Sequence, residues 1–304
     1  MQFFFEVLIS GLLAGVMYSL VALGFVLIYK ASGVFNFAQG SMVFFAALAT
    51  VGFLDKGLPF WVAAALALAC MVVLALLTER LVLRPLVNQP PITLFMATIG
   101  LSFFLDGLAQ GFWGANVHGL ELGIADEPIP WIADNTGINV SKFDLVASGI
   151  AAMLVAVLAV FFSRTRIGRA LRAVADDHQA ALAVGIPLQH IWVIVWGVAG
   201  FVALVTGLLW GARNGVSYSL TFLALKALPV LILGGFESVA GAIVGGLIIG
   251  ASEKLAEIYI PPVIHDWTGV SVSGLEAWFA YIVALLFLLV RPEGLFGEKR
   301  IDRV

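Results

Sequence analysis

The stretch that sets the fold class is SRTRIGRALRAVADDHQAALAVGIPLQH, residues 163–190. It carries four arginines, Arg164, Arg166, Arg169 and Arg172, and it lies between two long apolar runs. Charged side chains at this density are too costly to place in hydrocarbon. The stretch therefore predicts a loop outside a membrane, with the apolar runs around it as membrane-spanning helices.

The composition supports the same class. The chain has 304 residues, of which 62% are hydrophobic and only 12% charged, with a mean hydropathy of +1.06. A soluble domain carries about 25% charged residues. We therefore expect an all-α fold, a polytopic membrane helical bundle, built as one transmembrane domain over residues 1–304. Cys70 is the single cysteine and the four histidines are scattered, which argues against a disulfide framework and a zinc site.

About 20 apolar residues cross a bilayer. Apolar runs occupy 6–29, 34–54, 59–78, 92–114, 143–162, 190–210 and 275–290, and residues 221–257 hold two apolar arms separated by LGGFESVAG. The first arm is too short to span comfortably alone, so the expected number of transmembrane segments is nine, or eight if that arm is re-entrant. The spacing of Gly11 and Gly15 permits close helix packing.

The distribution of basic residues predicts the orientation. With the N-terminus outside and the spans alternating, most of the 16 lysines and arginines, including the four loop arginines, fall on the inner side. The acidic linker 115–142 then lies outside. This places the C-terminus in the cytoplasm and residues 163–190 in a cytoplasmic loop.

Two of the apolar segments are interrupted, one in each half of the chain. Irregular backbone at membrane depth is tolerated where it is buried in protein or lines a wet cavity, and paired interruptions point to a solute pathway. The alternative is a pair of tight turns at the membrane surface. The candidate pathway residues are Asn36, Gln39 and Gly40 in the first interruption and Gly234, Gly235 and Glu237 in the second.

Two ionisable residues lie in apolar runs. Lys226 either borders the pathway or makes a buried contact, or it extends its amine to the outer interface, which is the preferred interpretation. Asp106 is taken as the only acid deep in an apolar run. With Gln110 one turn later it predicts a polar seam between helices.

Catalytic motifs are absent from the sequence. The dipeptide Gly-Lys of a P-loop does not occur, and neither G-x-S-x-G nor H-E-x-x-H is present. We therefore expect a transport subunit that is not an enzyme and holds no cofactor. If transport is uphill, another subunit supplies the energy.

The second half of the polar stretch predicts a short helix. Asp176 and Gln179 have capping-box spacing, and Gly185 before Pro187 ends the helix, which gives residues 177–184. Its small apolar patch, Ala180, Ala181 and Val184, suits docking of another protein. The alternative is an amphipathic connector whose arginines meet anionic membrane lipid.

Here the chain resembles a known family. Gln179-Ala180-Ala181-x-x-x-Gly185 is similar to the EAA-x-x-x-G signature of ABC importer permeases, with Gln179 in place of the glutamate. From end to end the chain resembles the branched-chain amino acid ABC permeases of the LivH type. Two departures fall in the interruptions: Gln39 replaces the histidine of NFAHG, and Phe236-Glu237-Ser238 replaces Ile-Gly-Ser. The motifs that carry the resemblance are 22–42, 79–86, 163–186, 225–250 and 289–297.

The resemblance implies a permease subunit in a bacterial cytoplasmic (inner) membrane, working by alternating access in an ATP-driven importer for branched-chain or related hydrophobic amino acids. It implies a second homologous permease subunit, a periplasmic solute-binding protein and two cytoplasmic ATPase subunits that bind the ATP, and no nucleic acid. The ATPase-coupling residues would be Asp177, Gln179, Ala180, Ala181 and Gly185. The alternatives are urea, short amides or aromatic carboxylates as cargo, or a stand-alone channel or secondary carrier for a small neutral solute.

Overall fold

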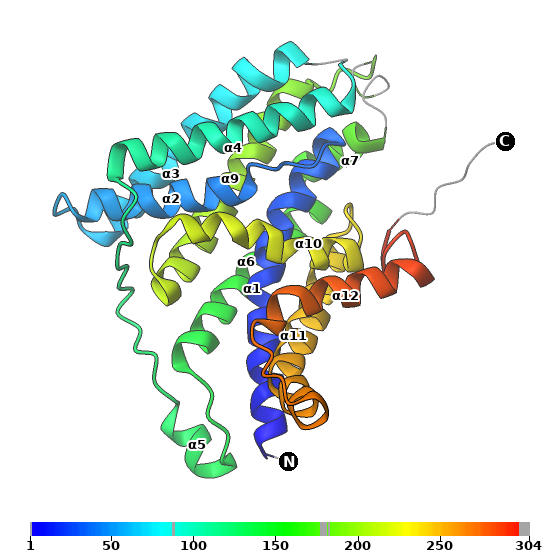
Figure 1. The fold of residues 1–304 in the computed structure, drawn as a ribbon. Coiled ribbons are helices and arrows are strands. Elements are labelled where there is room, and N and C mark those ends of the chain that lie inside the picture. The colour runs from blue at the N-terminus through cyan, green and yellow to red at the C-terminus, as the bar shows by residue number, and fades with distance from the viewer. Residues whose placement is uncertain (1, 87–88, 177–180, 182, 298–304) are drawn as a thin grey trace. The chain divides into compact units, whose positions relative to one another are not determined.

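The computed structural model describes residues 2–86, 89–176, 181 and 183–297. Within these ranges the chain is helical and forms no strand, with only two isolated β-bridges, His118 to Val216 and Pro128 to Ser141 (Figure 1). The prediction of an all-α membrane helical bundle is confirmed. The chain divides into two compact units: unit 1 is Met1–Ala22, Gly123–Val155 and Lys226–Val304, and unit 2 is Leu23–Leu122 and Ala156–Leu225.

Six helices in the described residues are long and apolar enough to cross a membrane. Three shorter apolar helices accompany them, and α2, with 16 residues, is only about 24 Å long against a hydrocarbon core of about 30 Å. The long helices are α1 (Gln2–Ser32), α3 (Phe60–Thr78) with its extensions η1 (Glu79–Leu83) and η2 (Arg84–Leu86), α4 (Pro91–Trp113), α6 (Lys142–Arg164), α9 (Leu188–Asn214) and α11 (Val239–Thr268). The shorter ones are α2 (Gln39–Leu54), η3 (Tyr218–Phe222) with α10 (Leu223–Gly234), and α12 (Leu275–Val290).

Unit 2 is built around α2. This helix is apolar on every side, and a helix of that kind belongs in the interior. It packs against α3, α4 and α9, and its residues from Gln39 to Gly52 are all buried. Gly207 lets α9 approach closely, because a Cβ atom there would lie 2.6 Å from the carbonyl oxygen of Val43. Close packing of this kind drives helix association in lipid, where burial of apolar surface gains little.

Unit 1 contains the first part of α1 and the helices α11 and α12, which pack against each other. The predicted close packing at Gly11 and Gly15 is confirmed, and the partner is α11. A Cβ atom on Gly15 would overlap the carbonyl oxygen of Gly246, and one on Gly11 would lie 2.8 Å from that of Gly250. Both helices therefore present glycines four residues apart, which brings their backbones together.

One boundary and two helices differ from the sequence prediction. The second apolar arm was expected to end at residue 257, but α11 continues to Thr268 with Pro261 and Pro262 inside it. The four arginines were expected in a loop, but three of them, Arg166, Arg169 and Arg172, lie on α7 (Arg166–Asp176). The linker 115–142 also holds a short helix, α5 (Pro130–Thr136).

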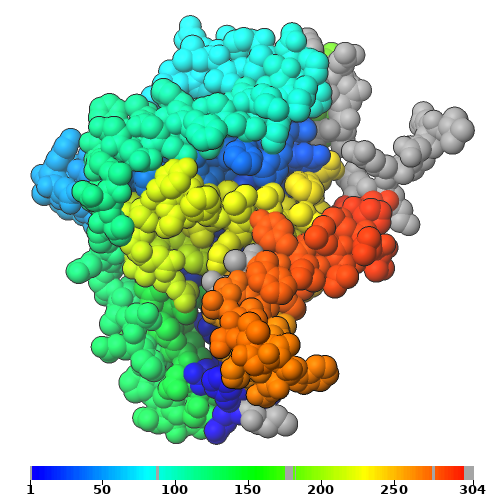
Figure 2. All heavy atoms as spheres, viewed as in Figure 1, coloured from blue at the N-terminus to red at the C-terminus, as the bar shows by residue number. Residues whose placement is uncertain are grey.

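Large apolar side chains remain exposed along the spanning helices. On unit 2 they include Trp61 and Val73 of α3 and Phe103 and Phe112 of α4. Side chains of α3 and α4 form much of the surface of unit 2 that Figure 2 shows. Such surfaces are unfavourable in water and suit hydrocarbon or a partner subunit.

Candidate functional site: two interrupted helices and their polar clusters

The first interruption joins α1 to α2 within unit 2. Gly33 ends α1 in the left-handed region, with φ of 68°. The turn is then held by Asn36, whose Oδ1 accepts a hydrogen bond from the backbone N–H of Ala38 at 3.1 Å. Its Nδ2 donates to Oε1 of Gln39 at 3.4 Å. Asn36 thus gives the N–H of Ala38 the acceptor that it lacks in the interrupted backbone.

The predicted pathway residues of this interruption are packed inside unit 2. Asn36 and Gln39 are 0% exposed. Gln39 fits against Gly24, where a Cβ atom would overlap the amide, and Gly40 fits against the backbone of Thr221. In this conformation Asn36 holds a closed turn, and Gln39 and Gly40 lie in the tightly packed first turn of α2.

Three polar side chains of α4 continue this cluster. Thr98 Oγ1 accepts a hydrogen bond from the backbone N–H of Phe37 at 3.1 Å, and Ser102 pairs with Ser41 of α2 at 2.7 Å between hydroxyl oxygens. Asp106 follows one turn later and is buried, and its Oδ1 has no hydrogen-bond partner among the described residues. Thr98, Ser102 and Asp106 therefore follow one another along α4, whereas Gln110, the other member of the predicted seam, lines the cavity described next.

A cavity of about 450 Å³ lies at the end of this seam. Asp106, Gln110 and Phe103 of α4 line it, together with Tyr218 of η3. The cavity combines aromatic walls with a carboxylate and an amide. Pockets for small polar solutes have this character, with mainly apolar walls and a few placed polar groups.

The second interruption, in unit 1, is formed by glycines, main-chain contacts and one capping serine. Gly235 has φ of 102°, and Ser238 caps α11 by accepting a hydrogen bond from the N–H of Gly241 at 3.0 Å. A Cβ atom on Gly234 would overlap the carbonyl of Gly241, so α10 and α11 touch through their backbones at the turn. The expected turn near Gly234 and Gly235 is confirmed. Glu237 is exposed at its tip.

Residues 295–297 pack against this turn and hydrogen-bond to it. The backbone N–H groups of Leu295 and Phe296 donate to the carbonyls of Leu233 and Gly234 at 2.8 and 3.1 Å. A Cβ atom on Gly235 would lie 2.9 Å from the backbone nitrogen of Gly297. The carbonyls that α10 leaves unpaired at its end thus find donors in residues 295 and 296.

A partly buried ion pair between α10 and α11 was not predicted from the sequence. Lys226 Nζ lies 3.5 Å from Glu253 Oε1, which also accepts a hydrogen bond from the hydroxyl of Tyr18 at 3.1 Å. The Lys226 amine lies 5.9 Å from the centroid of the Tyr18 ring, within the range of a cation–π contact. Tyr18, Lys226 and Glu253, which we call the triad, all belong to unit 1.

The triad corrects two expectations. Glu253 is 3% exposed, so Asp106 is not the only acid buried in an apolar run. Lys226, 34% exposed at its side chain, pairs with Glu253, whereas the preferred interpretation was an amine extended to the outer interface. The pair cannot be recognised from the sequence, because its two members lie 27 residues apart on two different helices. A lysine within an apolar run nevertheless indicates an acidic partner on another apolar segment.

The basic stretch lies at one end of unit 2. Arg172 donates from Nη1 to the carbonyl of Phe162 at 2.6 Å, which folds α7 back against the end of α6. Arg84 donates to the side chain of Gln189 at the start of α9, and α7 also packs against α9. Trp192 Nε1 donates to the carbonyl of Ala31 at 3.1 Å. The ends of α1, η2, α6 and α7 are therefore gathered with their basic residues around the start of α9.

The predicted coupling residues lie partly outside this description. Asp177, Gln179 and Ala180, and most of the predicted helix 177–184, fall outside the described residues. Ala181 is buried, so it does not join the exposed patch expected with Val184, which is itself exposed. Gly185 has φ of 84° and nothing within 4 Å of an added Cβ, as expected of a residue that ends a helix.

Comparison with known proteins gives one family over nearly the whole chain. The family described as branched-chain amino acid transport system / permease component matches residues 7–291. The high-affinity branched-chain amino acid transport system permease protein LivH of Escherichia coli (strain K12) is 27% identical over 326 residues, covering 99% of this chain and 98% of that protein. The corresponding BraD of Pseudomonas aeruginosa is 27% identical over 312 residues, with the same coverage.

More distant likenesses also exist. The fructose import permease protein FruF of Bifidobacterium longum is 24% identical over 299 residues, covering 94% of this chain and 78% of that protein. The solved structure of PsaBC from Streptococcus pneumoniae in complex with Fab aligns with 94% of this chain and 92% of that chain. Its identity is 12% and its TM-score 0.49, a likeness too low to carry an argument.

Proposed function

The chain belongs to the branched-chain amino acid transport system / permease component family, and on that premise we propose that it is one permease subunit of an ATP-driven importer for branched-chain or related hydrophobic amino acids. The observation that carries the proposal is the extent of the match. Residues 7–291 run from the first turns of α1 to the end of α12, so they include every apolar helix of the described chain. The relatives named LivH and BraD belong to branched-chain amino acid transport systems, which supports this substrate class.

The subunit lies in the bacterial inner membrane with the basic end of unit 2 toward the cytoplasm. The support is the gathering of Arg84 and Arg172 around the start of α9, because basic residues concentrate on the cytoplasmic side. At this end α7 and the segment ending at Gly185 present the surface to two ATPase subunits. A second permease subunit completes the membrane part, and a periplasmic binding protein delivers the amino acid on the opposite side.

Transport proceeds by alternating access, in which ATP binding on the partner subunits favours one of two arrangements of the helices. Such coupling needs a contact that differs in strength between the two states. The two interruptions suit this role, because interrupted helices are where spans bend. The closed turn at Asn36 and the glycine turn at Gly234 and Gly235 would open toward the pathway in the other state, with Gln39, Gly40 and Glu237 beside them.

Competition for uptake tests the substrate class. The chain and the subunits encoded with it are expressed in a bacterium that lacks its own branched-chain uptake, and accumulation of labelled leucine is measured. We expect excess isoleucine or valine to reduce it strongly, and urea, acetamide or benzoate to leave it unchanged. Leucine uptake no higher than in the host, together with uptake of one of those other solutes, would reject branched-chain amino acids as cargo.

A matched pair of exposed valines tests the docking of the ATPase. Val184→Asp places a charge on the proposed docking surface, and Val117→Asp places one on a similarly exposed valine of the 115–142 linker. We expect V184D to reduce both uptake and the amount of ATPase subunit that co-purifies, and V117D to leave the ATPase bound. Equal ATPase recovery with both variants would contradict docking at this segment.

A further inference from the structure

The cavity of about 450 Å³ beside α4 is lined entirely by residues of unit 2. Asp106, Gly107 and Gln110 of α4 line it together with Tyr218 of η3. Ala115, which also lines it, opens the linker that we expect outside the membrane. The cavity therefore belongs to the predicted outer end of α4, on the side from which an importer takes up its solute.

Asp106 brings a carboxylate without a cation to this cavity. The residue is 6% exposed, its Oδ1 has no hydrogen-bond partner, and no ion pair joins it to any described residue. Ser41 interacts with the carboxylate, but its hydroxyl is neutral and also pairs with Ser102. A buried carboxylate without a cation is costly. Because the terminal bond of an aspartate side chain rotates broadly, the carboxylate can turn either oxygen toward a cation in the cavity.

Hydrogen-bond donors suited to a carboxylate lie beside Asp106. Gln110 follows Asp106 by one helical turn, so the two side chains are neighbours on one face of α4. The amide of Gln110 carries two N–H donors, and the hydroxyl of Tyr218 can donate as well. Phe103, one turn before Asp106 on the same face, adds an apolar wall. The lining thus offers an acceptor for a cation, donors for an anion and apolar surface at neighbouring positions.

We propose that this cavity binds the zwitterionic head of an α-amino acid, with Asp106 accepting from the ammonium and Gln110 and Tyr218 donating to the carboxylate. The inference rests on the proposed function, because it names the site at which that cargo is recognised within the membrane.

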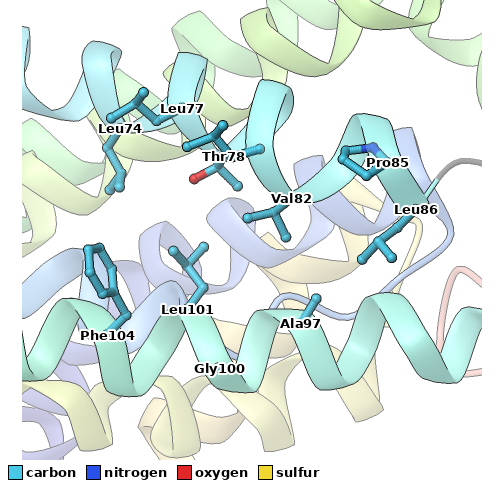
Figure 3. A pocket seen from close by; sticks show the side chains of 11 residues that line it. Leu74, Leu77, Thr78, Val82, Pro85, Leu86, Ala97, Gly100, Leu101 and Phe104 are labelled. Carbon is cyan, nitrogen blue, oxygen red and sulfur yellow. The ribbon is translucent and has the colours of Figure 1, made fainter.

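Two comparisons support a zwitterion as the occupant. A calcium ion takes about six to eight oxygen ligands, and the described residues hold no group of three or more acidic, histidine or cysteine side chains that could bind a metal ion. The groove of about 480 Å³ between α3 and α4, shown in Figure 3, has no ionisable residue in its lining. That groove offers nothing to a charged head group, whereas the cavity at Asp106 offers a partner for each of its two charges.

Two glycines of α4 provide a matched pair of cavity-filling variants. Gly107 lines the cavity, Gly100 lines the groove between α3 and α4, and a Cβ atom on either meets nothing within 4 Å. Each is replaced by leucine in the complex purified with its second permease and ATPase subunits but without the binding protein. The rise in unfolding temperature with added leucine then gives the half-saturating concentration. We expect that concentration to be unchanged in G100L and to rise about tenfold or more in G107L.

Solutes that carry one half of the head group separate the two contacts. Isoamylamine has the ammonium without the carboxylate, and isocaproate has the carboxylate without the ammonium. Asp106→Asn should weaken binding of leucine and isoamylamine about tenfold, because hydrogen bonds to charged groups are strong, and should leave isocaproate binding no weaker. Gln110→Ala and Tyr218→Phe should weaken leucine and isocaproate about fivefold and leave isoamylamine unchanged.

Two further variants control for charge and for fold. Asp106→Glu keeps the charge and should restore much of the affinity for leucine and isoamylamine. Asp144→Asn replaces a buried acid of α6 that does not line the cavity, and it should change binding of none of the three solutes. A merely structural role of Asp106 would weaken all three solutes alike.

Three results would overturn the proposal. One is a wild-type complex that leucine does not stabilise, or equal leucine affinity in G107L and G100L. Another is loss of all three solutes together in D106N. The third is a D106N complex that no longer retains its second permease subunit, which would pair Asp106 with a cation of that subunit. A wild type that binds leucine but imports none rejects the proposed function, whereas normal leucine binding and import by D106N rejects this site alone.

Discussion

The two interruptions replace their missing backbone hydrogen bonds in two different ways. Between α1 and α2 the missing backbone hydrogen bonds are replaced by side chains, chiefly the amide of Asn36. Between α10 and α11 they are replaced by backbone groups of the C-terminal segment, and the turn is compact because Gly234 and Gly241 touch through their main chains. The first turn therefore depends mainly on one polar side chain, and the second mainly on glycines that let the main chains touch, with the side chain of Ser238 capping α11.

The largest effect is expected in the second turn. Gly234→Ala forces a Cβ atom into the carbonyl of Gly241, and neither atom belongs to a flexible side chain. We expect a loss of more than about 3 kcal/mol of stability, at the upper end of the cost of overpacking, with little folded protein recovered. Thermal unfolding in detergent measures it. Gly149→Ala on α6, with open space at the Cβ position, is the control and should be neutral or slightly stabilising.

The triad connects the first helix of this turn, α10, to α11. Lys226→Met removes the cation that lies 3.5 Å from the buried Glu253, and we expect a cost of up to about 3 kcal/mol, the lower end for a buried pair, because the lysine side chain is 34% exposed. The double variant Lys226→Met, Glu253→Leu removes both charges and should regain most of the loss. Both are measured by thermal unfolding in detergent. A double variant no more stable than K226M would show that the ion pair is not what matters at this position.

In the first turn, replacing Asn36 should cost more stability than replacing Gly33. Asn36→Ala removes the acceptor for Ala38 and the donor to Gln39, at a cost of about 2 kcal/mol. Asn116→Ala, in an exposed loop, should change stability by less than about 0.5 kcal/mol. The denaturation midpoints of the two variants are compared. Equal midpoints would show that Asn36 does not stabilise the turn.

The smallest effect is expected at Gly33. Its φ of 68° disfavours a side chain, but no atom lies within 4 Å of an added Cβ. Gly33→Ala should therefore cost about 1 kcal/mol of conformational strain, and Gly33→Asn less, because asparagine tolerates the left-handed region. Both values come from the same unfolding curves. A cost as large as that of Gly234→Ala would erase the distinction between the two turns.

Much of the fold was predictable, because long apolar runs leave few choices. The last span was predicted at 275–290, and α12 is Leu275–Val290. Both interruptions were located from their glycines and polar residues. The end of α11 was missed because Pro261 and Pro262 normally stop a helix, yet here they lie inside one. α7 was missed because its arginines were read as loop residues.

The candidate site was less predictable, because its contacts join distant residues. Asn36 was singled out for its type, but its role as the support of a closed turn required the geometry. Glu253 carries no local signal, since it stands in a mixed segment next to Lys254 and four residues before Glu257. Only the packing of α10 on α11 shows that it meets Lys226.

The most direct test of the central claim is transport by the reconstituted complex. The chain, its partner permease and its ATPase subunits are placed in proteoliposomes with the leucine-loaded binding protein outside and ATP or ADP enclosed inside. Leucine uptake is then followed with time. The proposed function predicts accumulation above the outside concentration with ATP and none with ADP. Equal uptake with ATP and ADP, or uptake by the chain alone, would contradict an ATP-driven permease and favour a channel or secondary carrier.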